Sequence, residues 1–94
     1  MSAAALLTQW LAHLRDERRF AANSLDAYRR DVAAFLGFLA DHLGGEASAG
    51  DLTAIEPRDM RAYLAFRRQG EEALGDRSIS RALAAIRSFY RYLE

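Results

Sequence analysis

Four arginines and two serines recur along one face of residues 77–93, which read RSISRALAAIRSFYRYL. At about 100° per residue, one arc of this helix is apolar. The opposite arc carries Arg77, Ser80, Arg81, Ala84, Arg87, Ser88 and Arg91, and the segment contains no acid. Guanidinium forks suit phosphates and guanine edges, and short serines reach a backbone. The pattern indicates a helix that offers its four arginines, without ion partners, to a polyanion; the alternative is a solvated face whose ion partners come from other helices.

The apolar arcs predict which side of each helix is buried. The predicted helices cover about residues 3–19, 24–43, 57–69 and 77–93. Their expected core stripes are Leu7, Trp10, Leu11 and Leu14; Leu25, Tyr28, Val32, Phe35, Leu36, Leu39 and Leu43; Met60, Tyr63, Leu64 and Phe66; and Ile79, Ala82, Leu83, Ile86, Phe89, Tyr90 and Leu93. No segment alternates as a strand does, so the expected fold class is all-α.

Capping residues mark the expected helix ends. Asn23 or Ser24 is expected to cap the second helix, and Asp76 or Ser78 the fourth. Residues 44–54 are rich in small and acidic side chains and are expected to form a loop.

Composition sets the class of protein. The chain has 94 residues, of which 51% are hydrophobic, enough for one small core. It has no cysteine, so disulfides and thiolate metal sites are excluded. No apolar run approaches the ~20 residues that span a bilayer, and the N-terminus lacks the basic region of a signal peptide. We expect a soluble, cytoplasmic protein that contacts no membrane.

Charge is unevenly distributed although the formal net charge is zero. Residues 41–59 contain five acids and one arginine, whereas residues 77–93 contain four arginines and no acid. Zero net charge argues against strong nonspecific binding of nucleic acid. All thirteen basic residues are arginine, which fits bidentate recognition but also follows from a GC-rich coding sequence.

No pattern for catalysis is present. The two histidines are isolated, and no glycine-rich phosphate loop occurs. We therefore expect no cofactor, no metal site, no small-molecule substrate and no enzymatic activity from this chain alone.

Several stretches resemble the N-terminal core-binding domain of tyrosine recombinases. SLDAYRRD at residues 24–31, followed by FL at 35–36 and 38–39, is similar to that domain's second helix. SRALAAIRSFYRYL at residues 80–93 is similar to its fourth helix. Asp51-Leu52 with Ile55, and Asp59-Met60 with Tyr63-Leu64, resemble the segment between them. The resemblance covers nearly the whole chain and is closest to the bacterial Xer type, which resolves chromosome dimers.

The resemblance implies a four-helix orthogonal bundle of the SAM-like type, with residues 1–94 as one core-binding domain. That domain is half of a C-shaped clamp on double-stranded DNA, with its second and fourth helices facing the major groove. The expected partners are DNA and other recombinase subunits in a tetramer. Catalytic residues are expected in a second domain after Glu94, and none is assigned here. The implied DNA-contacting residues are Asn23, Ser24, Arg29, Arg30, Arg77, Ser78, Ser80, Arg81, Arg87 and Arg91.

Two other functions remain open at this point. A helical protein-interaction module is possible, because the acidic residues 41–59 complement the basic helix of a second copy. A helix-turn-helix regulator is disfavoured, because no short helix and tight turn precede the basic helix. A DNA role predicts that Arg81→Glu weakens binding without unfolding the domain.

Overall fold

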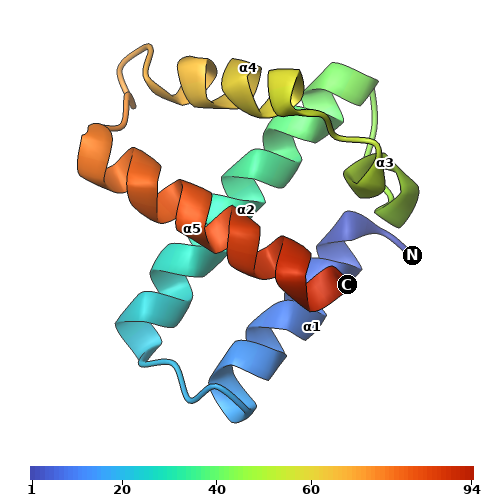
Figure 1. Ribbon diagram of the computed structural model, residues 1–94, viewed down its shortest axis with the longest axis vertical. Helices are drawn as coiled ribbons and strands as arrows, with labels where there is room; N and C mark the ends of the chain where they lie inside the picture. Colours follow the sequence, from blue (N-terminus) through green and yellow to red (C-terminus); the bar gives the residue numbers. More distant parts are fainter.

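The computed structural model describes residues 1–94 and is all-helical (Figure 1). The four predicted helices are present, and a fifth short one lies between the second and third. The elements are α1 (Ala3–Asp16), α2 (Ala22–Leu43), α3 (Ala49–Thr53), α4 (Pro57–Arg67) and α5 (Asp76–Leu93). None of these helices combines the length and the apolar character needed to cross a bilayer.

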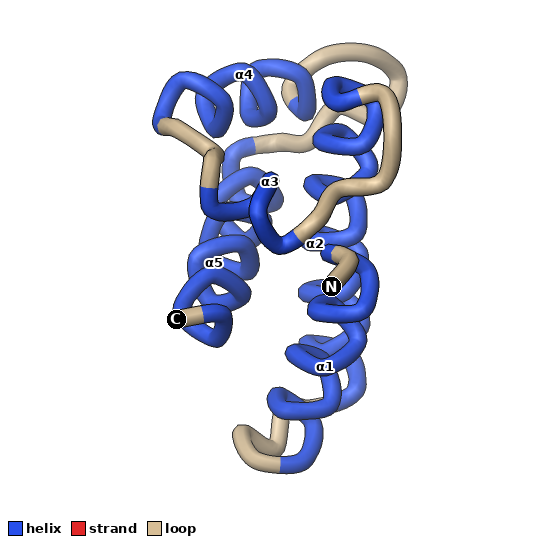
Figure 2. The backbone as a smooth tube through the Cα atoms, turned by 90° about the vertical axis from the view of Figure 1, so that its right-hand side faces the viewer, coloured by secondary structure: helices blue, strands red, loops and turns tan.

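The long helices α1, α2 and α5 form the body of the molecule. α1 and α2 run antiparallel, and α5 crosses over α2 (Figure 1). α4 lies across one end of this body, above α3 (Figure 2). Since α5 packs on α2 and also touches α1, one side of α5 is covered and the other faces away from the bundle.

Aromatic side chains fill the core where these helices meet. The Trp10 ring lies 5.3 Å from that of Phe89, and Phe35 lies 5.2 Å from Tyr63, both edge to face. All four residues are at most 1% exposed. Each predicted core stripe therefore contributes one fully buried ring to the core. Large rings at the helix crossings bury the most apolar surface and so contribute most to the stability of the core.

Helix starts differ from the prediction. The N-cap of α2 is Ala21, without a side-chain hydrogen bond, so Asn23 and Ser24 lie inside the first turn. Phe20, just before that cap, packs against Tyr28 in the second turn of α2, with ring centroids 5.4 Å apart. The N-cap of α5 is Gly75.

Asp76 and Ser78, the predicted N-caps of α5, both lie inside the helix. Asp76 is the first helical residue, and its carboxylate accepts a hydrogen bond from Arg68 at 2.8 Å. Ser78 lies in the first turn of α5 and is half-buried. A negative charge at this position also favours the helix dipole, so Asp76 stabilises the helix start without capping it.

Residues 44–54 are not simply a loop, because they contain α3. Ser48 Oγ accepts from the Asp51 amide at 3.2 Å, while Asp51 Oδ2 accepts from the Ser48 amide at 2.9 Å. This reciprocal pair is a capping box, and it stabilises a helix of one turn that buries Leu52. The first helix is shorter than the predicted range of about 3–19. α1 ends at Asp16, and Arg19 has left the helical conformation, with a left-handed φ of 53°.

Two residues of the predicted core stripes are exposed. Leu43 is the last residue of α2 and is 54% exposed. Phe66 is 56% exposed and packs on Phe38 from outside, with ring centroids 5.2 Å apart. The apolar spacing of these helices therefore continues past the end of the core.

Leu39 and Leu43 offer a matched test of this boundary, one turn apart on α2. Leu39 is 4% exposed, so Leu39→Ala should reduce the free energy of unfolding by about 2–5 kcal/mol. Leu43→Ala should change it by no more than about 0.5 kcal/mol. Urea denaturation measures both, and equal losses would contradict the core described here.

Tyr90 predicts how stability depends on alkaline pH. Its hydroxyl donates to the Leu52 carbonyl at 2.8 Å, and burial raises the pKa of Tyr90 to about 12. An unfolded tyrosine ionises near pH 10, so the stabilisation is complete below about pH 10 and is lost as pH rises toward 12.

The chain has no lysine, so few other groups titrate in this range. We expect the free energy of unfolding to fall between about pH 10 and 12. In Tyr90→Phe it should fall less steeply, and the slopes of the two proteins should differ by up to about 1.4 kcal/mol per pH unit. Urea midpoints across this range measure the slope; equal slopes for the two proteins would refute the assignment to Tyr90.

Candidate nucleic-acid interface

The apolar side of α5 faces the core, as predicted. Ile79, Ala82, Ile86 and Phe89 are buried, and Ala85 is buried beside them. The opposite side is open to solvent, with Ser88 half-buried at its margin. Its exposed residues, here called the α5 face, are Arg77, Ser80, Arg81, Ala84, Arg87 and Arg91.

One arginine of the α5 face is neutralised, which contradicts the expectation that all four are free. Arg81 donates from Nε to Asp31 Oδ2 at 2.8 Å and from Nη2 to Oδ1 at 2.9 Å. The Asp31 side chain is 5% exposed, while that of Arg81 is 41% exposed. These bonds raise the pKa of Arg81 above its ordinary value. The acid that the α5 segment lacks is therefore supplied by α2.

Asp31 is absent from the site residues that the sequence predicts, although its spacing is a usable signal. It lies three residues after Tyr28 and four before Phe35, so it falls on the buried stripe of α2. An acid at such a position needs a cationic partner, because an unpaired buried charge is costly. Which arginine supplies that partner depends on the crossing of α2 and α5.

The other three arginines of the α5 face have no partner. Arg77, Arg87 and Arg91 make no ion pair and no side-chain hydrogen bond within the chain. Arg77 and Arg91 are separated by fourteen residues, or roughly 21 Å of helix. Three unneutralised guanidinium groups on one exposed helix side make an electropositive stripe.

The start of α2 contributes less positive charge than the sequence suggests. Arg29 and Arg30 both contact Asp26, at 2.8 and 3.2 Å. These bonds, chiefly the one from Arg29, hold the pKa of Asp26 below its usual value. Asn23 and Ser24 are exposed. The local i,i+4 pairing of Asp26 with Arg30 that the spacing allows is therefore present, and all four groups remain accessible to solvent.

Direction also separates the predicted residues of α2. Ser24 lies two turns before Asp31 and shares the side of α2 that meets α5. Arg29 is rotated by about 160° from Asp31 and points away from that side. By this geometry Ser24 lies on the side of α2 that carries Asp31, two turns from the Asp31–Arg81 pair, and Arg29 lies on the opposite side.

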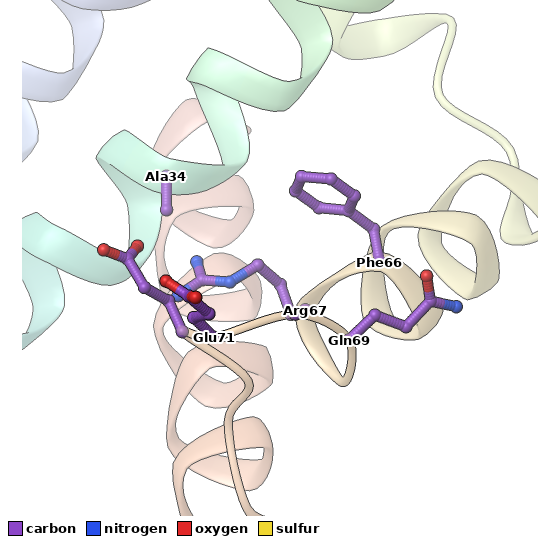
Figure 3. Close-up of a pocket in the computed structure, with 7 residues that line it drawn as sticks. Ala34, Phe66, Arg67, Gln69 and Glu71 are labelled. Atoms are coloured by element: carbon purple, nitrogen blue, oxygen red, sulfur yellow. The ribbon is translucent and has the colours of Figure 1, made fainter.

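A large recess lies elsewhere, between α2 and the end of α4. It has a volume of about 730 Å³ and is open to solvent, and Figure 3 shows Arg67 reaching toward Ala34 with Glu71 beside it. Arg67 donates to the Tyr63 hydroxyl at 3.0 Å. With both Glu71 and Glu72 in its lining, the recess lacks the uniformly positive character of the α5 face. No group of three His, Cys, Asp or Glu side chains is placed to hold a metal ion.

The Asp31–Arg81 pair changes the expected effect of Arg81→Glu. That substitution faces a buried carboxylate with a second one, so we now expect destabilisation rather than an intact fold. Breaking a buried pair costs about 3–5 kcal/mol, and the partial exposure of Arg81 places this case at the lower end. Arg87→Glu, on the same helix without a partner, should leave the urea midpoint essentially unchanged. Equal midpoints for the two variants would contradict the role of the pair.

Comparison with known proteins agrees with this architecture. The family model described as "Phage integrase, N-terminal SAM-like domain" matches residues 7–94. Tyrosine recombinase XerC of Rhizobium meliloti (strain 1021) is 48% identical over 86 residues, covering 92% of this chain and 26% of the relative. Tyrosine recombinase XerC of Brucella suis biovar 1 is 41% identical over 91 residues, covering 97% of this chain and 28% of the relative.

The chain therefore spans about a quarter of the length of the relatives that it matches. No solved structure matches it. The family match covers α2 through α5 completely and most of α1. The chain belongs to the phage integrase N-terminal SAM-like domain family.

Proposed function

We propose that this domain is the DNA-binding clamp of a site-specific tyrosine recombinase. The observation that carries the proposal is the stripe of three unpaired arginines on the exposed side of α5. The two relatives named above are both tyrosine recombinases, which supports the same function. In this proposal, α5 and the start of α2 enter the major groove, which is wide enough for a helix.

The proposed DNA-contacting residues follow from charge and direction. Arg77, Arg87 and Arg91 bind phosphates, and Ser78, Ser80 and Arg81 lie among them on the same helix. On α2, Asn23, Ser24 and Arg30 lie toward this surface. Arg29 points away from it, and its contact with DNA stays a prediction from the family resemblance. The stripe of roughly 21 Å is long enough to follow about six base pairs.

Affinity for DNA should be modest. Thirteen acids balance thirteen bases, so attraction comes from the local stripe and not from net charge. With few phosphate contacts, the chain should bind duplex DNA with a Kd of roughly 10⁻⁴–10⁻⁶ M at physiological salt. A second DNA-binding domain of the same protein would raise the total affinity by joining two contacts.

The proposal extends to the biological role. Relatives with the XerC name support a part in recombination of the Xer type, which in this proposal resolves chromosome dimers in the cytoplasm. The partners are other recombinase subunits assembled on the same DNA. The nucleophile and its arginines belong to a part of the recombinase outside residues 1–94, and this domain supplies binding and orientation.

Arg87→Gln tests the proposed face. Loss of one phosphate contact should weaken binding at low salt and reduce the slope of log K against log salt by about 0.9. Fluorescence anisotropy with a labelled duplex between about 50 and 200 mM salt measures the slope. Arg58→Gln is the matched control, because Arg58 lies among the acids of residues 41–59 and contacts Glu56 at 3.1 Å. The face is wrong if both variants lose the same slope, or if neither does.

A further inference from the structure

The hydrogen bonds between Asp31 and Arg81 leave the end of the guanidinium group free. Asp31 accepts from Nε and from one N–H of Nη2, which together form the side edge of the group. The end fork, with one N–H on Nη2 and one on Nη1, has no partner in the chain, and neither has the second N–H of Nη1. Arg81 can therefore hold Asp31 and a second, planar acceptor pair at once.

Burial of Asp31 fixes the orientation of Arg81. The carboxylate is almost fully enclosed, so movement of Arg81 toward solvent would leave a buried charge without a partner. An arginine without such a partner must lose side-chain freedom when it binds its target. Arg81 has lost that freedom already on folding, and its fork is presented from a fixed point at the crossing of α2 and α5.

The negative charge of Asp31 balances the positive charge of Arg81, so the pair as a whole has no net charge. A neutralised guanidinium group attracts a phosphate less than Arg77, Arg87 or Arg91, which have no ionic partner. It keeps its donors, however, and a neutral acceptor pair requires donors more than charge. In the major groove, guanine O6 and N7 are such a pair and match the arginine fork in two hydrogen bonds.

We infer that Asp31 is a positioning residue that holds Arg81 for reading a guanine edge, while the unpaired arginines of the α5 face bind phosphates. This inference rests on the proposed DNA-binding function and divides its residues into two classes. Arg81 carries base specificity with little dependence on salt. Arg77, Arg87 and Arg91 carry the salt-dependent affinity for any sequence.

The experiment compares binding to two versions of one duplex. The duplex is one that the parent chain enriches from a random pool, made either with guanine or with 7-deazaguanine, which lacks the N7 acceptor. Parent, Arg81→Gln, Arg87→Gln and Asp31→Asn are titrated against both versions at several salt concentrations. Circular dichroism confirms that each variant is folded before it is compared.

The parent should bind the 7-deazaguanine duplex several-fold more weakly, because one hydrogen bond of a bidentate pair is lost. Arg81→Gln should bind both versions equally and keep the salt slope of the parent. Arg87→Gln should keep the several-fold preference and lose about 0.9 of the slope. If Arg81→Gln loses slope and keeps the preference, the inference is overturned while the proposed function stands.

Asp31→Asn separates positioning from a purely structural role. Without the carboxylate, the positive charge of Arg81 is no longer balanced and its side chain is free to move. The slope of log K against log salt should therefore rise, and the preference for guanine over 7-deazaguanine should shrink. A purely structural Asp31 would lower the urea midpoint without moving either quantity. If this variant does not fold, the Arg81→Gln and Arg87→Gln comparison still decides the inference. A parent chain that binds neither duplex overturns the proposed function together with the inference.

Discussion

One ion pair, between the buried Asp31 of α2 and the partly exposed Arg81 of α5, constrains the arrangement on which the site depends. It joins two helices fifty residues apart in sequence at the point where they cross. Apolar contacts alone tolerate small rotations of one helix on another, since many packings bury similar areas. A bidentate hydrogen-bonded pair requires a particular distance and direction, and therefore limits how far α5 can rotate or slide on α2.

The distribution of acids explains how a chain of zero net charge presents a positive surface. Asp26, Asp31 and Asp76 each contact an arginine of the same molecule near the α5 face or its neighbours. Arg77, Arg87 and Arg91 remain without acids, and they all lie on one side of one helix. On the α5 face, charge pairing therefore neutralises Arg81 and leaves the other three arginines available to a polyanion.

The bundle gives this surface a rigid support. Trp10, Phe35, Tyr63 and Phe89 fill the space beneath α5 and come from four different helices. At the C-terminal end of α5, Tyr90 donates to the carbonyl of Leu52 in α3, and the N-terminus pairs with the residues before α3 through Ala3 and Ala47. The Tyr90 bond holds the C-terminal end of α5, and the bond from Arg68 to Asp76 holds its N-terminal end, so the spacing of its arginines is set before any ligand binds.

Local sequence determined the helices, their buried sides and the outward direction of the α5 face, because apolar spacing and helix-stop residues such as Gly44 act over a few residues. The predicted caps were wrong at Asn23, Ser24 and Asp76, because α2 and α5 begin after Ala21 and Gly75, which cap them without a side-chain hydrogen bond. Local sequence also failed at Leu43 and Phe66, whose apolar spacing continues beyond the neighbours that would cover them. Which arginines of the α5 face have an acid partner depends on the tertiary structure alone. Arg81 has no acid within four residues, and its partner lies fifty residues away, so only the packing of α2 against α5 separates one paired arginine from three free ones.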